Sequence, residues 1–267
     1  MKPKHHALLL IFSLAATLVI WATPNTAEAF LFEVSGGMKG GFNGSAGPGI
    51  SNGGRIHDQH GQTFTVENPE YYSHFGFGGS FGLVLELRAL GFLGLETGLY
   101  YSRDNGQGWV DKNDAATGAT LVTIHSEQTS TAYHFPILLR ANIPNPLIRP
   151  FLGVGFEFVR QVNSTLEYRQ EQVHGRYSDS DFAQIQNRYQ ITPSNYTLFL
   201  VSTGMELKFG PVRIPIEVRA GYNLGFDEGL ESRATYDSDT NQIKYDGAYQ
   251  GHFGIFTGFM YDFDFLL

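Results

Sequence analysis

The sequence predicts an all-β protein, an antiparallel up-and-down transmembrane β-barrel of eight strands, from three observations. Apolar and polar side chains alternate with a period of two in eight segments, and successive side chains of a strand point to opposite faces. The connections between these segments are short and long in turn. The sequence ends inside an aromatic-rich alternating segment, which we expect of a last strand that closes against the first.

The first 29 residues are predicted to be a cleavable secretory signal. Lys2 and Lys4 precede an apolar stretch from Ala7 to Trp21, and Ala27-Glu28-Ala29 has the small-x-small pattern of a cleavage site. A membrane anchor is the alternative, but a stretch of fifteen residues is short for a helix of about 20 residues that spans a bilayer. Cleavage leaves residues 30–267 as one barrel domain.

The composition excludes several classes of protein. The chain has no cysteine, which excludes disulfides, thiol chemistry and a lipidated N-terminal cysteine. Loss of the signal removes two lysines and one glutamate, so the net charge moves from −8 to −9. An acidic chain is a poor candidate for binding nucleic acid by charge, and no nucleic-acid partner is expected.

The eight alternating segments give the expected strands in order. They begin near Phe30, Phe75, Phe92, Thr129, Pro150, Tyr196, Val212 and Tyr249. The clearest covers residues 212–226, where apolar side chains occupy every second position. An even number of strands is typical of a single-chain outer-membrane barrel. Residues 62–68 and 121–126 could extend or add strands, which leaves a count of ten open.

The connections alternate in length along the whole chain. Three are short, at Ala89 to Gly91, at Asn142 to Ile148 and at Gly210-Pro211. Four are long and rich in Gly, Asp, Asn, Ser and Gln, at residues 43–74, 103–128, 170–195 and 227–248. An up-and-down barrel places all short turns at one rim and all long loops at the other. We therefore expect short periplasmic turns and four long extracellular loops.

The outer face of the barrel is predicted to be apolar and the inner face polar. A soluble barrel has the opposite arrangement, with its apolar side chains packed inside. Here the apolar set has no charge in mid-strand, and its aromatic members lie near strand ends. They include Tyr196 and Tyr222 toward the loops, and Phe209 and Phe263 toward the turns. Two such belts are typical of a bilayer, so outer-membrane lipid and lipopolysaccharide are the expected surroundings.

The inward-facing set contains charged side chains of both signs in nearly equal number. They are Glu33, Lys39, Glu86, Arg88, Glu96, Arg140, Glu157, Glu206, Lys208, Arg213, Glu217, Arg219, Asp262 and Asp264. A lumen of eight strands is just wide enough for side chains, and an unpaired buried ion costs several kcal/mol. We therefore predict a structural ion-pair network that fills the periplasmic half of the lumen. A proton or ion path is the less favoured alternative.

These features together resemble the small outer-membrane β-barrel superfamily, which includes the OmpA transmembrane domain and OmpX. The resemblance covers residues 30–267 and rests on the export site, the strand number, the alternation of turns and loops, and the ending. That ending is Phe259-x-Tyr261-x-Phe263-x-Phe265-x-Leu267. The resemblance implies that it is a C-terminal assembly signal read by the barrel assembly machinery. The family usually ends on Phe or Trp, whereas this chain ends on Leu267, and the resemblance implies no activity.

The sequence contains no recognised catalytic or metal-binding pattern. Outer-membrane lipases and lipid A deacylases resemble one another in a His-x-Ser pair, but Gly254 follows His252 at that spacing, and no other histidine meets it. We interpret His134 and His252 as lumen-facing polar side chains. Residues 237–241 begin like a calcium loop, but Gln242 stands where its turn glycine belongs, so we interpret them as a turn. We expect no enzyme, no cofactor and no metal.

The expected function is a structural or surface-interaction role through the four long loops, whose ligand the sequence does not identify. Two alternatives remain. One is a small channel or porin-like transporter with ten or more strands. The other is an outer-membrane lipid-modifying enzyme.

Overall fold

The fold is seen in a computed structural model, which describes residues 32–47, 54–58, 63–66, 74–113, 120–173, 189–226 and 234–263. The predicted signal at residues 1–29 lies outside these ranges, and so do Asp264, Phe265 and Leu267. Within the described residues, no helix is long and apolar enough to cross a membrane.

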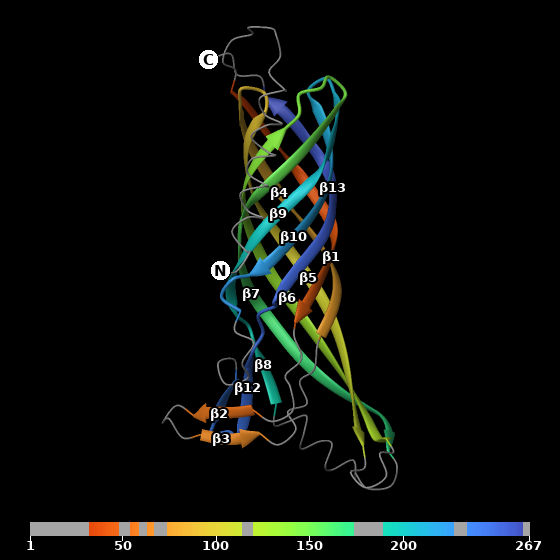
Figure 1. Cartoon of the computed structure of the whole chain (residues 1–267), viewed down its shortest axis with the longest axis vertical. Helices are drawn as coiled ribbons and strands as arrows, with labels where there is room; N and C mark the ends of the chain where they lie inside the picture. Colours follow the sequence, from red (N-terminus) through yellow and green to blue (C-terminus); the bar gives the residue numbers. More distant parts are fainter. Residues whose placement is uncertain are drawn as a thin grey trace, which may run out of the picture.

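Eight antiparallel strands close into an up-and-down barrel (Figure 1). They are β1 (Glu33–Gly47), β4 (His74–Ala89), β5 (Leu93–Asn113), β6 (Thr120–Asn142), β7 (Ile148–Val173), β9 (Asn195–Phe209), β10 (Val212–Asn223) and β13 (Gly251–Phe263). Each pairs with its neighbours in the sequence, and β13 closes against β1 with Phe259 opposite Met38. The predicted fold class is confirmed. The alternative of ten barrel strands is wrong, because the ring closes with eight.

Three short turns join the strands at one rim, as predicted. They connect β4 to β5, β6 to β7 and β9 to β10. The last is a two-residue turn, in which Gly210 has a φ of +61°, a left-handed conformation that glycine adopts without steric cost. This turn sets Val212 opposite Phe209 and so fixes the register of β9 and β10.

Three barrel strands are longer than the sequence predicted. β5, β6 and β7 contain 21, 23 and 26 residues, whereas a tilted strand needs only about 9–11 to cross a bilayer. The predicted loop at residues 103–128 is therefore wrong, and β6 begins at Thr120 rather than near Thr129. Outside the hydrocarbon a strand needs no apolar face, so the alternation used to find the strands ends before the strands do.

Segments of the long loops form a second sheet beyond the barrel, with strand order β3-β2-β11-β12-β8 (Figure 1). Its strands are β2 (Gly54–Asp58), β3 (Thr63–Val66), β8 (Tyr189–Thr192), β11 (Ala234–Asp237) and β12 (Gln242–Asp246). The sequence expected these segments as loop. The suggested strand at residues 62–68 exists as β3, but it joins this sheet and not the barrel. Parallel pairs of β11 with β2 and of β12 with β8 join three loops, and pairing between such distant segments leaves no local signal.

The hairpin of β11 and β12 turns at residues 238–241, the segment interpreted from the sequence as a turn. Asp237 accepts hydrogen bonds from the Lys244 ammonium at 2.8 Å and from the backbone N–H of Asp239 at 3.1 Å. The bond from Lys244, followed by those from Thr240, lowers the pKa of Asp237 to about 2. The carboxylate oxygens are thus occupied by the N–H groups of this hairpin.

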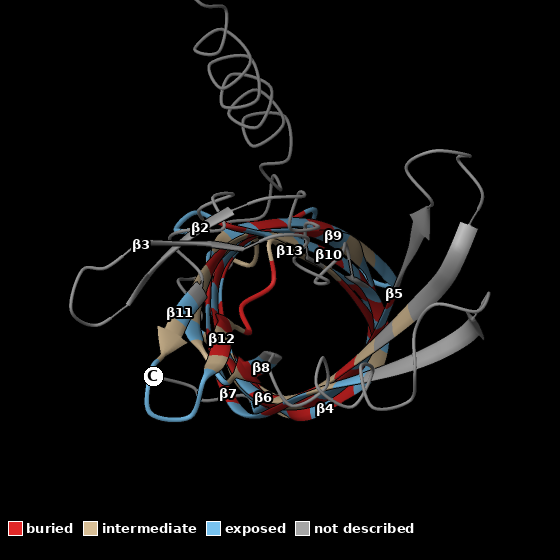
Figure 2. Cartoon of the chain, turned by 90° about the horizontal axis from the view of Figure 1, so that it is seen from below, coloured by how far each residue is buried: buried red, intermediate tan, exposed pale blue. Residues whose placement is uncertain are grey.

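The outward face of the barrel is apolar, as predicted. Leu83, Ile255 and Phe259 are 63%, 59% and 53% exposed, while alternate positions in the same strands are buried. Figure 2 shows this alternation around the ring, seen from the end that carries the loop strands. A closed sheet that presents large apolar side chains outward is stable in lipid rather than in water, so the barrel spans a membrane.

One predicted member of the outer aromatic belt faces the other way. Tyr196 points inward and packs against a buried cluster that includes Leu138, Leu198 and Leu200. In β9 the even-numbered residues 198, 200, 202 and 206 are buried, so Tyr196 lies on the same, inward face of the strand. The prediction was wrong because an amphipathic ring suits both a headgroup region and a partly polar lumen.

Placing a charge on the lipid face tests this assignment. Ile216 lies near the middle of β10 and is 42% exposed, so Ile216→Arg should lower the free energy of unfolding in lipid vesicles by about 2–4 kcal/mol. Urea titration of the vesicle-embedded barrel measures this. The control Ser238→Arg, in the exposed turn of the loop hairpin, should change stability little. Equal stability of Ile216→Arg and the parent would contradict the face assignment.

Candidate functional site

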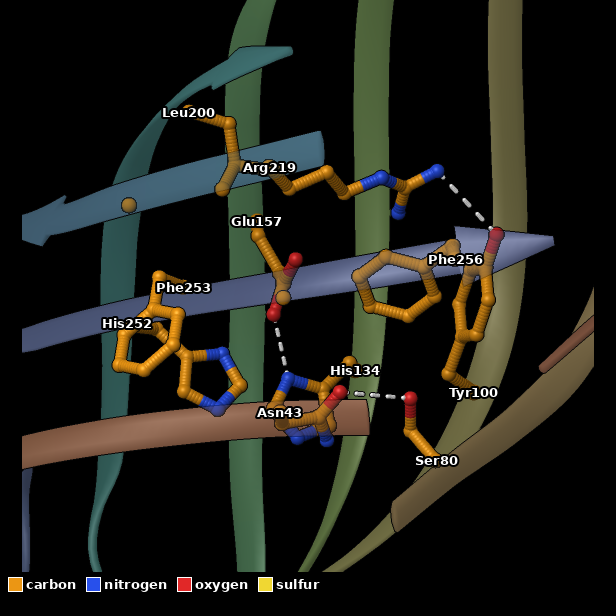
Figure 3. A pocket seen from close by; sticks show the side chains of 12 residues that line it. Asn43, Ser80, Tyr100, His134, Glu157, Leu200, Arg219, His252, Phe253 and Phe256 are labelled. Carbon is orange, nitrogen blue, oxygen red and sulfur yellow. Dashed lines mark hydrogen bonds and ion pairs between the residues drawn. The ribbon is translucent and has the colours of Figure 1, made fainter. Parts of the chain in front are cut away.

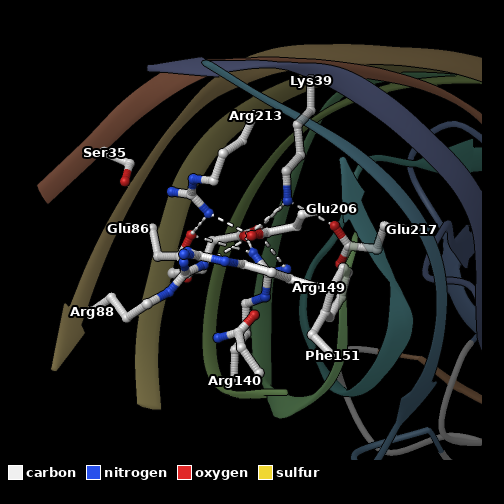
Figure 4. A network of polar contacts seen from close by, with 12 residues as sticks. Ser35, Lys39, Glu86, Arg88, Arg140, Arg149, Phe151, Glu206, Arg213 and Glu217 are labelled. Carbon is white, nitrogen blue, oxygen red and sulfur yellow. Dashed lines mark hydrogen bonds and ion pairs between the residues drawn. The ribbon is translucent and has the colours of Figure 1, made fainter. Parts of the chain in front are cut away.

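Charged side chains from seven strands meet in the half of the lumen nearest the short turns (Figure 4). Five are carboxylates and five are cations, and none is more than 4% exposed. They are Glu86, Glu96, Glu206, Glu217 and Asp262, with Lys39, Arg88, Arg140, Arg213 and Arg219. We call these ten residues the lumen network. Its charges balance, which a lumen without room for counter-ions requires.

Lys39 is the centre of the network on the loop side. Its ammonium donates to Glu96 at 2.7 Å and to Glu217 at 2.7 Å. Arg219 reaches the same two carboxylates, with Nε 2.6 Å from Glu217 and Nη2 2.7 Å from Glu96. Two cations and two carboxylates from three strands thus form a closed cycle of charge-assisted hydrogen bonds.

Arg140 connects this cycle to the part of the network nearer the turns. Its two terminal nitrogens donate to Glu96 at 2.6 Å and to Glu206 at 2.9 Å. The guanidinium also lies over the ring of Phe151, with its central carbon 3.7 Å from the centroid. The guanidinium thus makes two kinds of contact. The N–H donors at its edge bind the carboxylates, and its charged face packs on the aromatic ring.

Near the turns, two arginines share two glutamates. Arg213 donates to Glu86 and Glu206 at 2.8 Å each, and Arg88 donates to the same two carboxylates at 2.9 Å each. Arg213 also donates through Nε to Asp262 at 2.5 Å. Every network carboxylate therefore accepts hydrogen bonds from at least one cation. Deleting a carboxylate would leave a buried arginine with one partner fewer.

The remaining predicted charges lie at the edges of this network or away from it. Lys208 and Glu33 are at the turn-side rim, 3.1 Å from Asp262 and 3.4 Å from Arg88. Glu157 lies nearer the loops and contacts no network residue through an ion pair in the described part of the chain. Arg149 was missing from the predicted inward set, because it lies between the predicted turn, which ends at Ile148, and the predicted strand, which begins near Pro150. Its guanidinium is 3.8 Å from Glu33.

The loop-side end of the lumen is covered by residues 247–250, which leave β12 and turn into the barrel mouth. Gln161 donates to the Gly247 carbonyl at 2.7 Å, and Asn223 donates to the Tyr249 carbonyl at 3.1 Å. Ala248 and Tyr249 are 7% and 3% exposed. The segment is held by polar side chains of β7 and β10 and was not foreseen, because these residues have no alternating pattern.

A second polar cluster lies between the network and this mouth segment. His134 Nδ1 is in close hydrogen-bond contact with Glu157, and its Nε2 is 2.8 Å from the Ser102 hydroxyl. The ring of His252 stacks on that of His134, with centroids 5.3 Å apart and planes 7° apart. Asp104 lies 3.9 Å from His252 Nε2. Both histidines face the lumen, but no pattern in the sequence predicts that Ser102 and Asp104 lie beside them.

The order Ser102–His134–Glu157 matches that of a nucleophile, a base and an orienting carboxylate. Ser102 is fully buried, and it does not line the small cavity beside the histidines. A nucleophile must reach a substrate carbonyl, so these three residues do not form a site for acyl transfer. The hydrogen-bond chain instead fixes the orientation of the His134 ring.

Removing one carboxylate tests how far the lumen network depends on pairing. Glu96 accepts from Lys39, Arg140 and Arg219, so Glu96→Gln should lower the free energy of unfolding by about 3–5 kcal/mol. Urea unfolding in lipid measures it. The control Glu127→Gln, at an exposed hydrogen bond to Asn105, should change stability by less than about 0.5 kcal/mol. Adding Lys39→Met to Glu96→Gln should recover part of the lost stability. If Glu96→Gln changed stability no more than Glu127→Gln does, the network would be contradicted.

No protein-family model and no curated protein sequence matches this chain. Three similar solved structures are outer-membrane or surface proteins. OprG from Pseudomonas aeruginosa is 11% identical with a TM-score of 0.40, over 86% of this chain and 96% of that one. Neisserial surface protein A is 12% identical with a TM-score of 0.34, over 89% and 100%. Ail of Yersinia pestis is 9% identical with a TM-score of 0.31, over 86% and 99%.

The architecture itself identifies the type of protein. A closed ring of eight antiparallel strands with an apolar outer face and a polar lumen is the architecture of a small outer-membrane β-barrel. The chain is an integral membrane barrel of this type.

Proposed function

We propose that this protein is a closed outer-membrane barrel that anchors a platform of loop strands at the cell surface, with a structural or surface-interaction role. The observation that carries the proposal is the filling of the lumen by side chains while ordered strands continue beyond the membrane. The barrel supplies the anchor, and the loops supply the surface that other molecules would meet.

The lumen network is the first element that closes the barrel. Its hydrogen bonds are 2.5–3.1 Å long, and some cross the lumen between strands on opposite sides of the ring, such as β5 with β10 and β4 with β9. Moving an ion through it would separate fully buried pairs, and each separation costs several kcal/mol. The mouth segment at residues 247–250 is a second element in series, so loss of either one leaves the other in place.

The loop sheet is the part of the molecule suited to interaction. Parallel pairs tie β2 to β11 and β12 to β8, so segments from three long connections form one sheet. A surface ordered before a partner binds loses less conformational entropy on binding. The extended ends of β5, β6 and β7 add ordered backbone on the same side of the barrel (Figure 1).

Conductance in planar bilayers tests the closed lumen. The purified barrel should give no steady openings, and Tyr249→Ser, which weakens only the mouth segment, should also remain silent because the network still closes the lumen. A larger porin inserted under the same conditions shows that the assay detects channels. Steady openings of the parent on the nanosiemens scale would exclude the proposal.

Epitope insertion tests the orientation of the platform. A short tag placed at residues 238–241, in the β11–β12 turn, should be stained by antibody on intact cells. The same tag at Asn145, in the short turn between β6 and β7, should be stained only after the outer membrane is permeabilised. The reverse pattern would place the loop sheet in the periplasm and rule out a surface role.

A further inference from the structure

Two histidines and one glutamate converge on a small cavity in the loop-side half of the lumen (Figure 3). His134 comes from β6, Glu157 from β7 and His252 from β13. One nitrogen of each histidine and one carboxylate oxygen all lie within 4.8 Å of one another. Three ligand-type side chains from three strands are thus held around one point by the barrel itself.

The charge of this cluster is not balanced by protein cations. Within the described part of the chain, neither Glu157 nor Asp104 forms an ion pair with a lysine or arginine. Arg219 lines the same cavity, but its guanidinium is paired with Glu217 at 2.6 Å. Asp104 is 3% exposed, and its Oδ1 has no hydrogen-bond partner among the described residues. With neutral histidines the cluster has two negative charges, in contrast to the balanced network beside it.

The cavity has room for one small occupant. Its volume is about 20 Å³, and its walls include both histidines, Glu157, Tyr100 and Arg219. That is the space of about one water molecule. A metal ion held between the three ligand atoms would supply positive charge to this cluster, and the cavity beside it has room for one water as the remaining ligand.

We propose that His134, His252 and Glu157 bind one transition-metal dication of the Zn²⁺ class. Two imidazole nitrogens and one carboxylate oxygen are a ligand set that Zn²⁺ takes, with the fourth position left to water. Mg²⁺ and Ca²⁺ prefer oxygen ligands throughout, so this set selects against them. With zinc–ligand distances of about 2.0–2.2 Å, the ion would replace the present hydrogen bond between His134 Nδ1 and Glu157 by a bond from each of them to the metal, with side-chain rotation within the cavity.

Two neighbours are placed to support the metal ligands. When Nε2–H of His134 donates to the Ser102 hydroxyl, 2.8 Å away, the lone pair of Nδ1 faces Glu157 and the ion. Asp104 stands 3.9 Å from Nε2 of His252 and would orient that ring in the same way. Partners of this kind fix the tautomer of a metal-binding histidine and strengthen its binding. The ion would then join β6, β7 and β13 across the lumen.

Cobalt binding to the folded full-length barrel in detergent tests the proposal. Co²⁺ is the probe, because its visible absorption reports coordination by nitrogen and oxygen. We expect one Co²⁺ per chain, displaced by Zn²⁺ and not by excess Mg²⁺. His134→Gln and His252→Gln should each weaken binding at least tenfold, and Asp104→Asn about 10–100-fold. The matched control is His125→Gln, nine residues from His134 on the same strand, which should bind as the parent does.

Heat-modifiable migration on gels shows that each variant is folded before it is titrated. If a histidine variant fails to fold, Glu157→Gln gives the answer, because it keeps the side-chain volume and should still weaken binding at least tenfold. The proposal is overturned if the folded parent does not bind Co²⁺ at one per chain, or if the folded variants bind as the parent does. Neither result bears on the proposal that the lumen is closed, because conductance is measured without added metal.

Discussion

The backbone of a membrane-spanning sheet must satisfy all its hydrogen bonds internally, and the rest of this structure depends on that constraint. Lipid offers no donors or acceptors, so the sheet closes on itself, with β13 against β1. Closure with eight strands leaves a lumen only as wide as side chains. Apolar residues then face lipid at every second position, and the intervening residues, with their charges, are forced together inside. The lumen network is thus a consequence of closure as much as of the charges themselves.

The lumen contains two polar regions that obey different rules. In the lumen network every carboxylate is paired with a cation, and removing one partner leaves a buried charge uncompensated. The cluster at His134, Glu157 and His252 lies beside it, yet histidines stand where the network has arginines. Histidine binds metals and changes charge near neutral pH, whereas arginine does neither. One region is suited to stability and closure, and the other to a ligand.

The constraint relaxes where the strands leave the hydrocarbon. β5, β6 and β7 continue for many residues, and the loops build a sheet that mixes parallel and antiparallel pairs. Water can satisfy an exposed edge there, so the strands need neither closure nor an apolar face. This separation gives the surface platform an anchor that does not depend on what the platform binds.

The sequence by itself determined the fold class, the short turns and the faces of most strands, because period-two alternation is a local property of neighbouring residues. Inward positions such as Lys39, Glu96 and Glu217 followed from it. The tertiary structure alone decided their partners, since Lys39 meets Glu96 57 residues away and Glu217 178 residues away. It also decided the inward turn of Tyr196, the loop sheet and the meeting of His252 with His134 and Asp104. Register across a closed barrel sets these contacts, and register is a property of all eight strands together.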